Sequence, residues 1–152
     1  MADHFLDSSA LVKVYVEETR SDWVDSLTTA PIHSIWAVRV TGTEVVAGLF
    51  QRVRMNTLRQ AAALRATRRF RSEFGVNIRV IEVGRALVER AMDLAEHYPL
   101  RGYDAVQLAG ALTLRSLRTS RTASPFIFVS ADIRLNTAAR SEGFTVENPN
   151  DH

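Results

Sequence analysis

Short apolar runs alternate along the chain with stretches in which apolar residues recur at helical spacing. The apolar runs predict strands over residues 4–7, 31–40, 78–81, 126–129 and 144–146. Helical spacing predicts helices over residues 8–18, 41–50, 84–98, 104–117 and 132–141, and a helix or helical hairpin over the arginine-rich stretch after residue 51. Strands that alternate with helices of about ten or more residues favour parallel crossovers. The pattern therefore predicts an α/β domain with a mostly parallel central sheet.

Several polar residues stand where helices are expected to begin or end. Ser8 or Ser9 is placed to cap the first helix. The stretch from Thr41 to Glu44 has the S/T-x-x-E form of a capping box. Ser130 is placed to cap the last helix, which glycine 143 closes. In the arginine-rich stretch, an apolar stripe is predicted from a further set of residues: Leu58, Ala61, Ala62, Leu64 and Phe70.

Length and composition favour one domain over residues 1–152. The chain has 152 residues, of which 46% are hydrophobic, so it can bury a proper core. It contains no cysteine, which excludes disulfides, cysteine nucleophiles and metal sites held by sulfur. No stretch approaches the roughly 18 apolar residues of a membrane span, and the first residues lack the basic region of a signal peptide. We expect a cytoplasmic protein with no membrane partner.

The positive charge is carried by arginine and is concentrated in one segment. The chain has one lysine, Lys13, and eighteen arginines, and residues 51–80 hold eight arginines against the single acid Glu73, a local excess of +7. Guanidinium groups match phosphate oxygens and release counterions, so this segment suggests a polyanionic partner. A solvated helix face is the alternative interpretation. The single lysine does not stand in a Walker A loop, which excludes that class of phosphate site.

Four acids follow a predicted strand or open a predicted helix: Asp7, Glu44, Asp104 and Asp132. Each has a simple alternative role as a helix cap, a capping-box member or a partner of the helix dipole. In a parallel sheet, however, all four can converge at the carboxyl edge of the strands. Crowded carboxylates raise one another's pKa unless a cation neutralises them. A hard divalent cation with oxygen ligands, Mg²⁺ or Mn²⁺, suits such a group and suits phosphate chemistry.

Four segments that contain these acids resemble, in order, the acidic motifs of PIN-domain ribonucleases: FLDSSALVK (5–13), TEVV (43–46), LRGYDAVQLA (100–109) and VSAD (129–132). The closing Leu135-Asn136, Ala138-Ala139, Glu142-Gly143-Phe144 and Asn148-Pro149 are similar to the end of the VapC-type toxins of that family. The resemblance spans nearly the whole chain, although residues 52–83 match only loosely. It implies a three-layer α/β/α domain that hydrolyses RNA phosphodiesters with Mg²⁺ or Mn²⁺ and forms homodimers. It also implies inhibition by a VapB-type antitoxin, which typically inserts a C-terminal segment near the acidic pocket.

Under this resemblance we expect Asp7, Glu44 and Asp104 to form the inner metal-binding set, and Asp132 to complete the pocket. Second-shell roles are expected for a group of polar neighbours: Ser9, Ser130 and Asn136. Helix capping is the alternative role for the two serines, and local packing is the alternative for Asn136.

The arginine-rich segment is expected to contact RNA through Arg65, Arg68 and Arg69, or else to meet an acidic antitoxin tail. A housekeeping PIN nuclease and a catalytically silent RNA-binding domain are the alternative functions. A phosphatase of the haloacid dehalogenase kind is disfavoured because Ser9 stands where that pattern needs a second aspartate.

Overall fold

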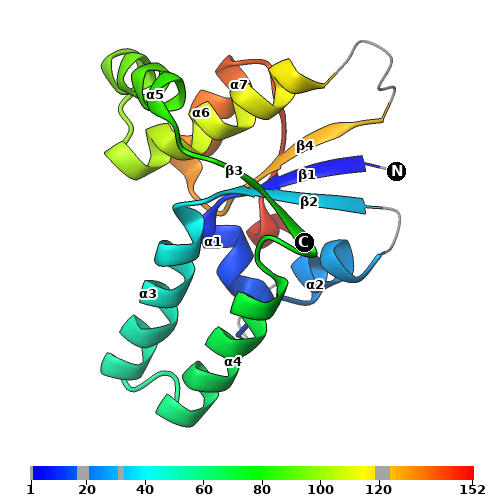
Figure 1. Ribbon diagram of the computed structural model, residues 1–152, viewed down its shortest axis with the longest axis vertical. Coiled ribbons are helices and arrows are strands. Elements are labelled where there is room, and N and C mark those ends of the chain that lie inside the picture. The colour runs from blue at the N-terminus through cyan, green and yellow to red at the C-terminus, as the bar shows by residue number, and fades with distance from the viewer. Residues whose placement is uncertain (1, 17–20, 31–32, 119–123) are drawn as a thin grey trace.

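The computed structural model describes residues 2–16, 21–30, 33–118 and 124–152. Its centre is a sheet of five strands, β1 (Ala2–Leu6), β2 (His33–Val38), β3 (Ile78–Ile81), β4 (Phe126–Val129) and β5 (Thr145–Glu147). The strand order is β3-β2-β1-β4-β5, and every neighbouring pair is parallel (Figure 1). The predicted parallel sheet is therefore confirmed.

Helices cover both faces of the sheet (Figure 1). One layer consists of α1 (Ser8–Leu11), the 3₁₀ helix η1 (Val12–Val14), α2 (Ser21–Thr29), α3 (Thr41–Arg54) and α4 (Gln60–Glu73). The opposite layer consists of α5 (Arg85–His97), α6 (Gly102–Leu117) and α7 (Ile133–Ser141). A short 3₁₀ helix, η2 (Pro149–Asp151), follows β5. This is the three-layer α/β/α arrangement that the sequence predicts. Within the described ranges, no helix is both long and apolar enough to cross a membrane.

The pleat of the strands builds a separate core on each face of the sheet. Phe5 and Phe128 lie side by side on neighbouring strands, with their rings stacked 5.6 Å apart, and pack under α5, α6 and α7. The next residues along, Leu6 and Val129, point to the other face and pack with α1, α3 and α4. Successive side chains of a strand point to opposite faces of the sheet. Two consecutive apolar residues therefore contribute one side chain to each of the two cores.

The strand order places a switch point at the end of β1. The chain moves from β1 outward to β2 and β3 on one side, and then returns to β4 and β5 on the other side. Ligand sites of open parallel sheets lie beyond the carboxyl ends of the strands at such a point. Asp7 follows β1 and Ser130 follows β4, so both stand at this position.

The first-layer helices differ in part from the predicted ones. The predicted helix over 8–18 is shorter, because α1 tightens into η1 and ends at Val14, while residue 18 lies outside the described residues. The sequence pattern did not predict α2, a nine-residue helix that buries Val24 and Leu27. Its short amphipathic pattern, followed at once by a strand, gave only a weak signal.

The arginine-rich stretch forms the predicted helical hairpin of α3 and α4, which projects away from the sheet (Figure 1). The predicted apolar stripe is only partly right. Phe70 is buried, but Ala61 and Leu64 are exposed, and the core face of α4 is carried by Ala63 and Phe70. These two residues are seven positions apart and therefore share one helix face, whereas Leu64 falls to the outer side.

Candidate active site

Asp7 is a buried carboxylate that takes three hydrogen bonds at the end of β1. Its Oδ1 accepts the Ala10 amide at 3.0 Å and the Ser9 hydroxyl at 2.7 Å, and its Oδ2 accepts the Ser130 hydroxyl at 2.8 Å. Asp7 is thus the N-cap of α1, the simple alternative role considered for it. The side chain is 3% exposed, and burial, with a smaller contribution from Glu44, raises its pKa to about 6 although the three donors oppose the shift.

Glu44 lies in the first turn of α3 and faces the same edge of the sheet. The predicted capping box does not form: α3 begins at Thr41, and its N-cap is Val40, which has no capping side chain. Instead, Glu44 Oε2 accepts the Ser8 hydroxyl at 2.9 Å, and Oε1 accepts Gln107 Nε2 at 2.8 Å. The Glu44 carboxylate therefore accepts hydrogen bonds from side chains of α1 and α6, and it does not cap its own helix as the local sequence predicts.

Gln107 and Thr41 are site residues that the sequence reasoning missed. Both are buried, and Gln107 Nε2 donates to Thr41 Oγ1 at 2.8 Å as well as to Glu44. A signal was present in the sequence: Gln107 interrupts an apolar helix face that includes Leu108, Ala109 and others. A buried amide needs partners, so such an interruption indicates a polar group nearby.

Ser9 and Ser130 connect the loops after β1 and β4. The Ser9 hydroxyl donates to Asp7 and accepts the amide of Ala131 at 3.0 Å. The Ser130 hydroxyl donates to Asp7 and accepts the amide of Asp132 at 3.0 Å. The prediction that Ser130 caps the last helix is wrong, because α7 begins at Ile133 and Asp132 is its N-cap. The serines fix the Asp7 carboxylate between two loops.

Asp104 and Asp132 form a second acidic pair. Asp104 lies in the first turn of α6, which begins at Gly102, two residues before the predicted start. Burial, then the charge of Asp132, raises the pKa of Asp104, while Arg101 and Arg134 partly oppose the shift. Arg134 was not singled out by sequence reasoning, and both arginines are exposed. Arg101 and Arg134 are therefore cationic neighbours of this pair.

Asn136 supports the loop after β4 from below. It is 2% exposed, and its Nδ2 donates to the Ser130 carbonyl at 2.8 Å. Within the described part of the chain, its Oδ1 is buried without a hydrogen-bond partner. The amide thus holds the backbone of Ser130, whose hydroxyl contacts Asp7.

The structure brings the four predicted acids to one edge of the sheet as two pairs. Asp7 and Glu44 interact electrostatically, as do Asp104 and Asp132. Contacts link the pairs, because Ser130 bridges Asp7 to the Asp132 amide, and Gln107 lies one helical turn after Asp104. Among the described residues, no three histidine or acidic side chains converge closely enough to form a preformed metal-binding group. The donors are nevertheless carboxylate oxygens, the ligands that hard divalent cations prefer.

A cavity of about 820 Å³ lies between the first turns of α3, the end of α4 and the segment after β3, and none of the four acids lines it. The first turns of α3 line one side through Thr43, the residue before Glu44, and Phe74 lines another. Arg39 forms an ion pair with Glu82 at the rim and lies over the Phe74 ring, 5.6 Å from its centroid. Gly42 is required here, since a Cβ would lie 2.8 Å from Phe74.

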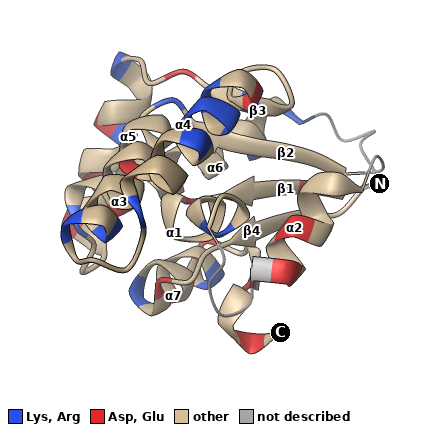
Figure 2. Cartoon of the chain, turned by 90° about the horizontal axis from the view of Figure 1, so that it is seen from below, with Lys and Arg blue, Asp and Glu red and all other residues tan. Residues whose placement is uncertain are grey.

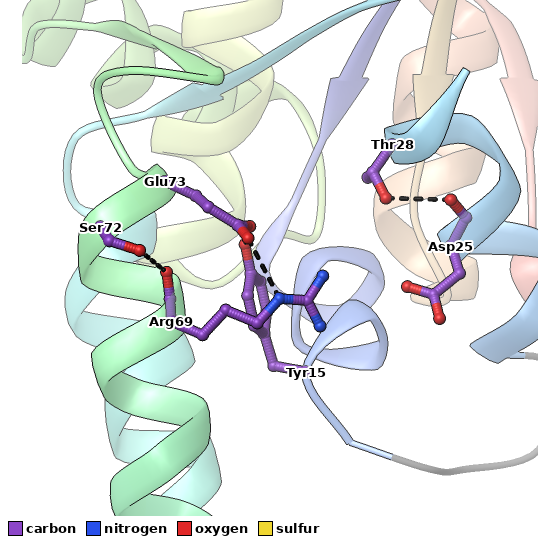
Figure 3. A network of polar contacts seen from close by, with 6 residues as sticks. All are labelled: Tyr15, Asp25, Thr28, Arg69, Ser72 and Glu73. Atoms are coloured by element: carbon purple, nitrogen blue, oxygen red, sulfur yellow. Dashed lines mark hydrogen bonds and ion pairs between the residues drawn. The ribbon is translucent and has the colours of Figure 1, made fainter. Parts of the chain in front are cut away.

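The three arginines predicted to bind RNA lie on α4, whose cartoon in Figure 2 has blue segments that mark Lys and Arg. Arg68 is exposed, and Arg65 lines a second cavity of about 560 Å³. Arg69 is engaged within the protein: its Nε donates to Glu73 at 3.0 Å, and its guanidinium lies over the Tyr15 ring (Figure 3). Tyr15 in turn donates its hydroxyl to Glu73. Arg69 therefore holds α4 against the end of η1.

Comparisons with known proteins agree with the observed fold. The sequence profile of the PIN domain matches residues 4–140. A toxin–antitoxin complex from Klebsiella pneumoniae is similar in structure, with a TM-score of 0.62 and 16% identity over 96% of this chain and 97% of that chain. FitAcB from Neisseria gonorrhoeae is similar with a TM-score of 0.63 and 15% identity, over 96% of this chain and 97% of that chain. VapC20 from Mycobacterium tuberculosis, a sarcin–ricin-loop-cleaving toxin, is similar with a TM-score of 0.60 and 18% identity, over 93% of this chain and 96% of that chain. No curated protein matches at the level of sequence. The profile match covers most of the chain, and the chain therefore belongs to the PIN-domain family.

Proposed function

We propose that this protein is a metal-dependent ribonuclease that acts as the toxin of a toxin–antitoxin pair. The observation that carries the proposal is the buried Asp7 carboxylate, fixed by three donors at the switch point of a PIN-domain sheet and placed beside Glu44. Burying an ionisable carboxyl group is costly, so the position of Asp7 favours a role in binding or chemistry.

The acids fit a divalent cation, Mg²⁺ or Mn²⁺. All the candidate ligands are carboxylate oxygens, and the pKa values of Asp7 and Asp104 are raised first by burial and further by the neighbouring charges of Glu44 and Asp132. Asp7, Glu44 and Asp104 would hold the ion, with Asp132 completing the pocket. A bound divalent cation activates water and offsets charge on a phosphate group. Ser9 and Ser130 donate to the Asp7 carboxylate, and Asn136 holds the backbone of Ser130.

The exposed cations around the acids favour a phosphate-containing substrate. Arg101 and Arg134 lie near Asp104 and are exposed, so their guanidinium groups are available to phosphate oxygens. Arg65 and Arg68 are further exposed cations, on α4. A water nucleophile needs no 2′-hydroxyl, so the acids alone do not distinguish RNA from DNA as the substrate. The choice of RNA is based on the family resemblance.

A VapB-type antitoxin and a homodimer are further parts of the proposal. The antitoxin is supported by several similar structures that are toxin–antitoxin complexes, including VapBC-1 from nontypeable Haemophilus influenzae and VapBC from Salmonella typhimurium, whereas the homodimer rests on the family resemblance. For this chain, coexpression with a small adjoining reading frame tests the antitoxin: relief of growth arrest supports a toxin, and growth arrest that no neighbour relieves favours a housekeeping nuclease.

A cleavage assay on total RNA tests the proposed activity. The purified protein, Asp7→Asn and the control Asp93→Asn, an exposed acid on α5, are each incubated with Mg²⁺, Mn²⁺ or EDTA. We expect cleavage by the wild type and by Asp93→Asn with metal only, and a loss of at least 100-fold in Asp7→Asn. Cleavage that persists in EDTA refutes the metal requirement. RNA binding without cleavage in any condition identifies a silent RNA-binding domain instead.

A further inference from the structure

The carboxylate of Glu44 is held on both oxygens by groups from two other elements. Ser8 donates to Oε2 at 2.9 Å, and Gln107 Nε2 donates to Oε1 at 2.8 Å. Ser8 belongs to α1 and Gln107 to α6, so the contact spans both helical layers at the edge of the sheet. A glutamate on a helix surface otherwise samples several rotamers, and these two donors select one of them.

The orientation of the Gln107 amide is determined by its partners. A carboxylate only accepts hydrogen bonds, so the amide turns its NH₂ group toward Glu44. The second Nε2 hydrogen meets Thr41 Oγ1 at 2.8 Å, and the Thr41 hydroxyl lies 3.1 Å from Gln107 Oε1. With the amide rotated, its carbonyl oxygen would face the carboxylate. Thr41 is fully buried, and its hydroxyl contacts both the nitrogen and the oxygen of the Gln107 amide, so it helps to hold that side chain beside Glu44.

The packing of α6 does not by itself require an amide at this position. Gln107 is 1% exposed, and the buried residues around it on α6, such as Leu108 and Ala111, are apolar. An apolar side chain of similar length would fill the same space without burying a polar group. The polar groups of Gln107 are used on Thr41 and Glu44, which indicates that its role lies in the site rather than in the core.

We propose that Gln107 and Thr41 are positioning residues that preorder Glu44 for a divalent cation. This inference rests on the proposed function, because it takes Glu44 as a metal ligand. Each carboxylate oxygen has a second lone pair, so the hydrogen bonds from Ser8 and Gln107 leave Glu44 able to coordinate a metal. Fixing the side chain before the ion arrives removes an ordering cost from the binding step. Partners that orient metal ligands typically affect metal affinity about 10-fold to 100-fold.

Titration calorimetry of Mn²⁺ into the full-length protein, without RNA, tests the inference. Gln107→Met keeps the volume and removes the donor, and we expect it to weaken Mn²⁺ binding about 10-fold to 100-fold. Thr41→Val removes the hydroxyl at nearly constant shape and should weaken Mn²⁺ binding several-fold. Thr41→Ser keeps the hydroxyl and should bind Mn²⁺ like the wild type. Thr113→Val, on the same helix but bonded only to the Ala109 carbonyl, should bind like the wild type.

Three outcomes separate the inference from its alternatives. Thermal unfolding that shifts in Gln107→Met or Thr41→Val while Mn²⁺ affinity stays unchanged shows a packing role and overturns the inference. Mn²⁺ binding that depends on Gln107 and Thr41 as expected supports the inference even if no RNA is cleaved, in which case only the proposed function fails. If the wild type binds no Mn²⁺ at all, the inference falls. Should Gln107→Met not fold, the comparison of Thr41→Val with Thr41→Ser decides the question alone.

Discussion

Asp7 combines deep burial with a negative charge, and this combination links the site to the stability of the fold. Its folded-state pKa of about 6 lies above the ordinary value of 3.8, so the folded protein binds a proton that the unfolded chain releases between these pH values. The contribution of Asp7 to stability is therefore fully present below about pH 3.8 and is lost as the pH rises through 6. Above that pH, the ionised carboxylate opposes folding.

We predict that Asp7→Asn is more stable than the wild type at pH 8, by of the order of 1 to 3 kcal/mol, because the amide removes the buried charge. Asparagine keeps an oxygen for Ser9 and Ala10, and its NH₂ group can donate to the Ser130 hydroxyl. Urea unfolding in EDTA at pH 8 and pH 5 measures the difference in the free energy of unfolding between the two proteins. Groups that titrate in both proteins cancel in this difference. The gain should shrink at pH 5, and a variant less stable than the wild type at pH 8 contradicts the prediction.

The positions of individual site residues were predictable from sequence only where the neighbouring strand or helix determines them. Asp7 follows a strand, and Asp132 opens a helix, so local pattern alone places both at the edge of the sheet. The partner of Glu44 was not predictable in this way, since Thr41 and Glu44 satisfy a capping box just as well locally. The distant donor Gln107 decides between the two arrangements, and only the packing of α6 against α3 brings it there.

The hairpin of α3 and α4 is fastened to the rest of the domain by the contacts of Tyr15, Arg69 and Glu73 (Figure 3). The pKa of the Tyr15 hydroxyl is raised by burial and by its hydrogen bond to Glu73, so Tyr15 remains a donor. The ion pair of Arg69 with Glu73 is half-exposed and contributes little by itself. The hydroxyl of Tyr15, which is buried, carries most of the connection to η1.

We predict a coupling free energy of about 1 kcal/mol between Tyr15 and Glu73, because a hydrogen bond to a charged acceptor is lost when either side chain is truncated. A double-mutant cycle of Tyr15→Phe and Glu73→Ala, measured by urea unfolding, gives this value. Pairing Tyr15→Phe with Glu89→Ala, a surface acid of α5, should be additive. If the Tyr15 and Glu73 substitutions are also additive, the contact does not fasten the hairpin.

Elements were predictable to the extent that their pattern repeats over enough residues. The parallel strands and the long helices α5 and α6 follow directly from apolar periodicity. The face that α4 turns inward was mispredicted, because alanines occupy positions on both sides and Leu64 stands on the outer one. Which side of such a helix is buried depends on Phe70 packing with Tyr15 and Phe74, contacts that tertiary structure alone supplies.

Across the whole molecule, the two acidic pairs lie at the carboxyl edge of the sheet, and α4 carries exposed arginines, which colour parts of its cartoon blue in Figure 2. This separation of charge suits a polyanion that contacts arginines outside the site while one phosphate reaches the acids. Arg69 is tied to Glu73, so Arg65 and Arg68 are the members of the predicted trio whose removal tests RNA contact with less disturbance of α4.

In an Asp7→Asn background that prevents cleavage, we predict that Arg65→Gln with Arg68→Gln weakens RNA binding and flattens its salt dependence. Each lost contact with a single-stranded phosphate lowers the slope of log affinity against log salt by about 0.7, so the double variant should lose about 1.4. Fluorescence anisotropy of a labelled RNA across a salt series measures the slope. The control, Arg85→Gln with Arg90→Gln, removes two exposed arginines from α5 in the opposite helical layer. An equal loss of slope in both double variants would show a general charge effect, and an unchanged slope in the α4 variant would place the RNA elsewhere.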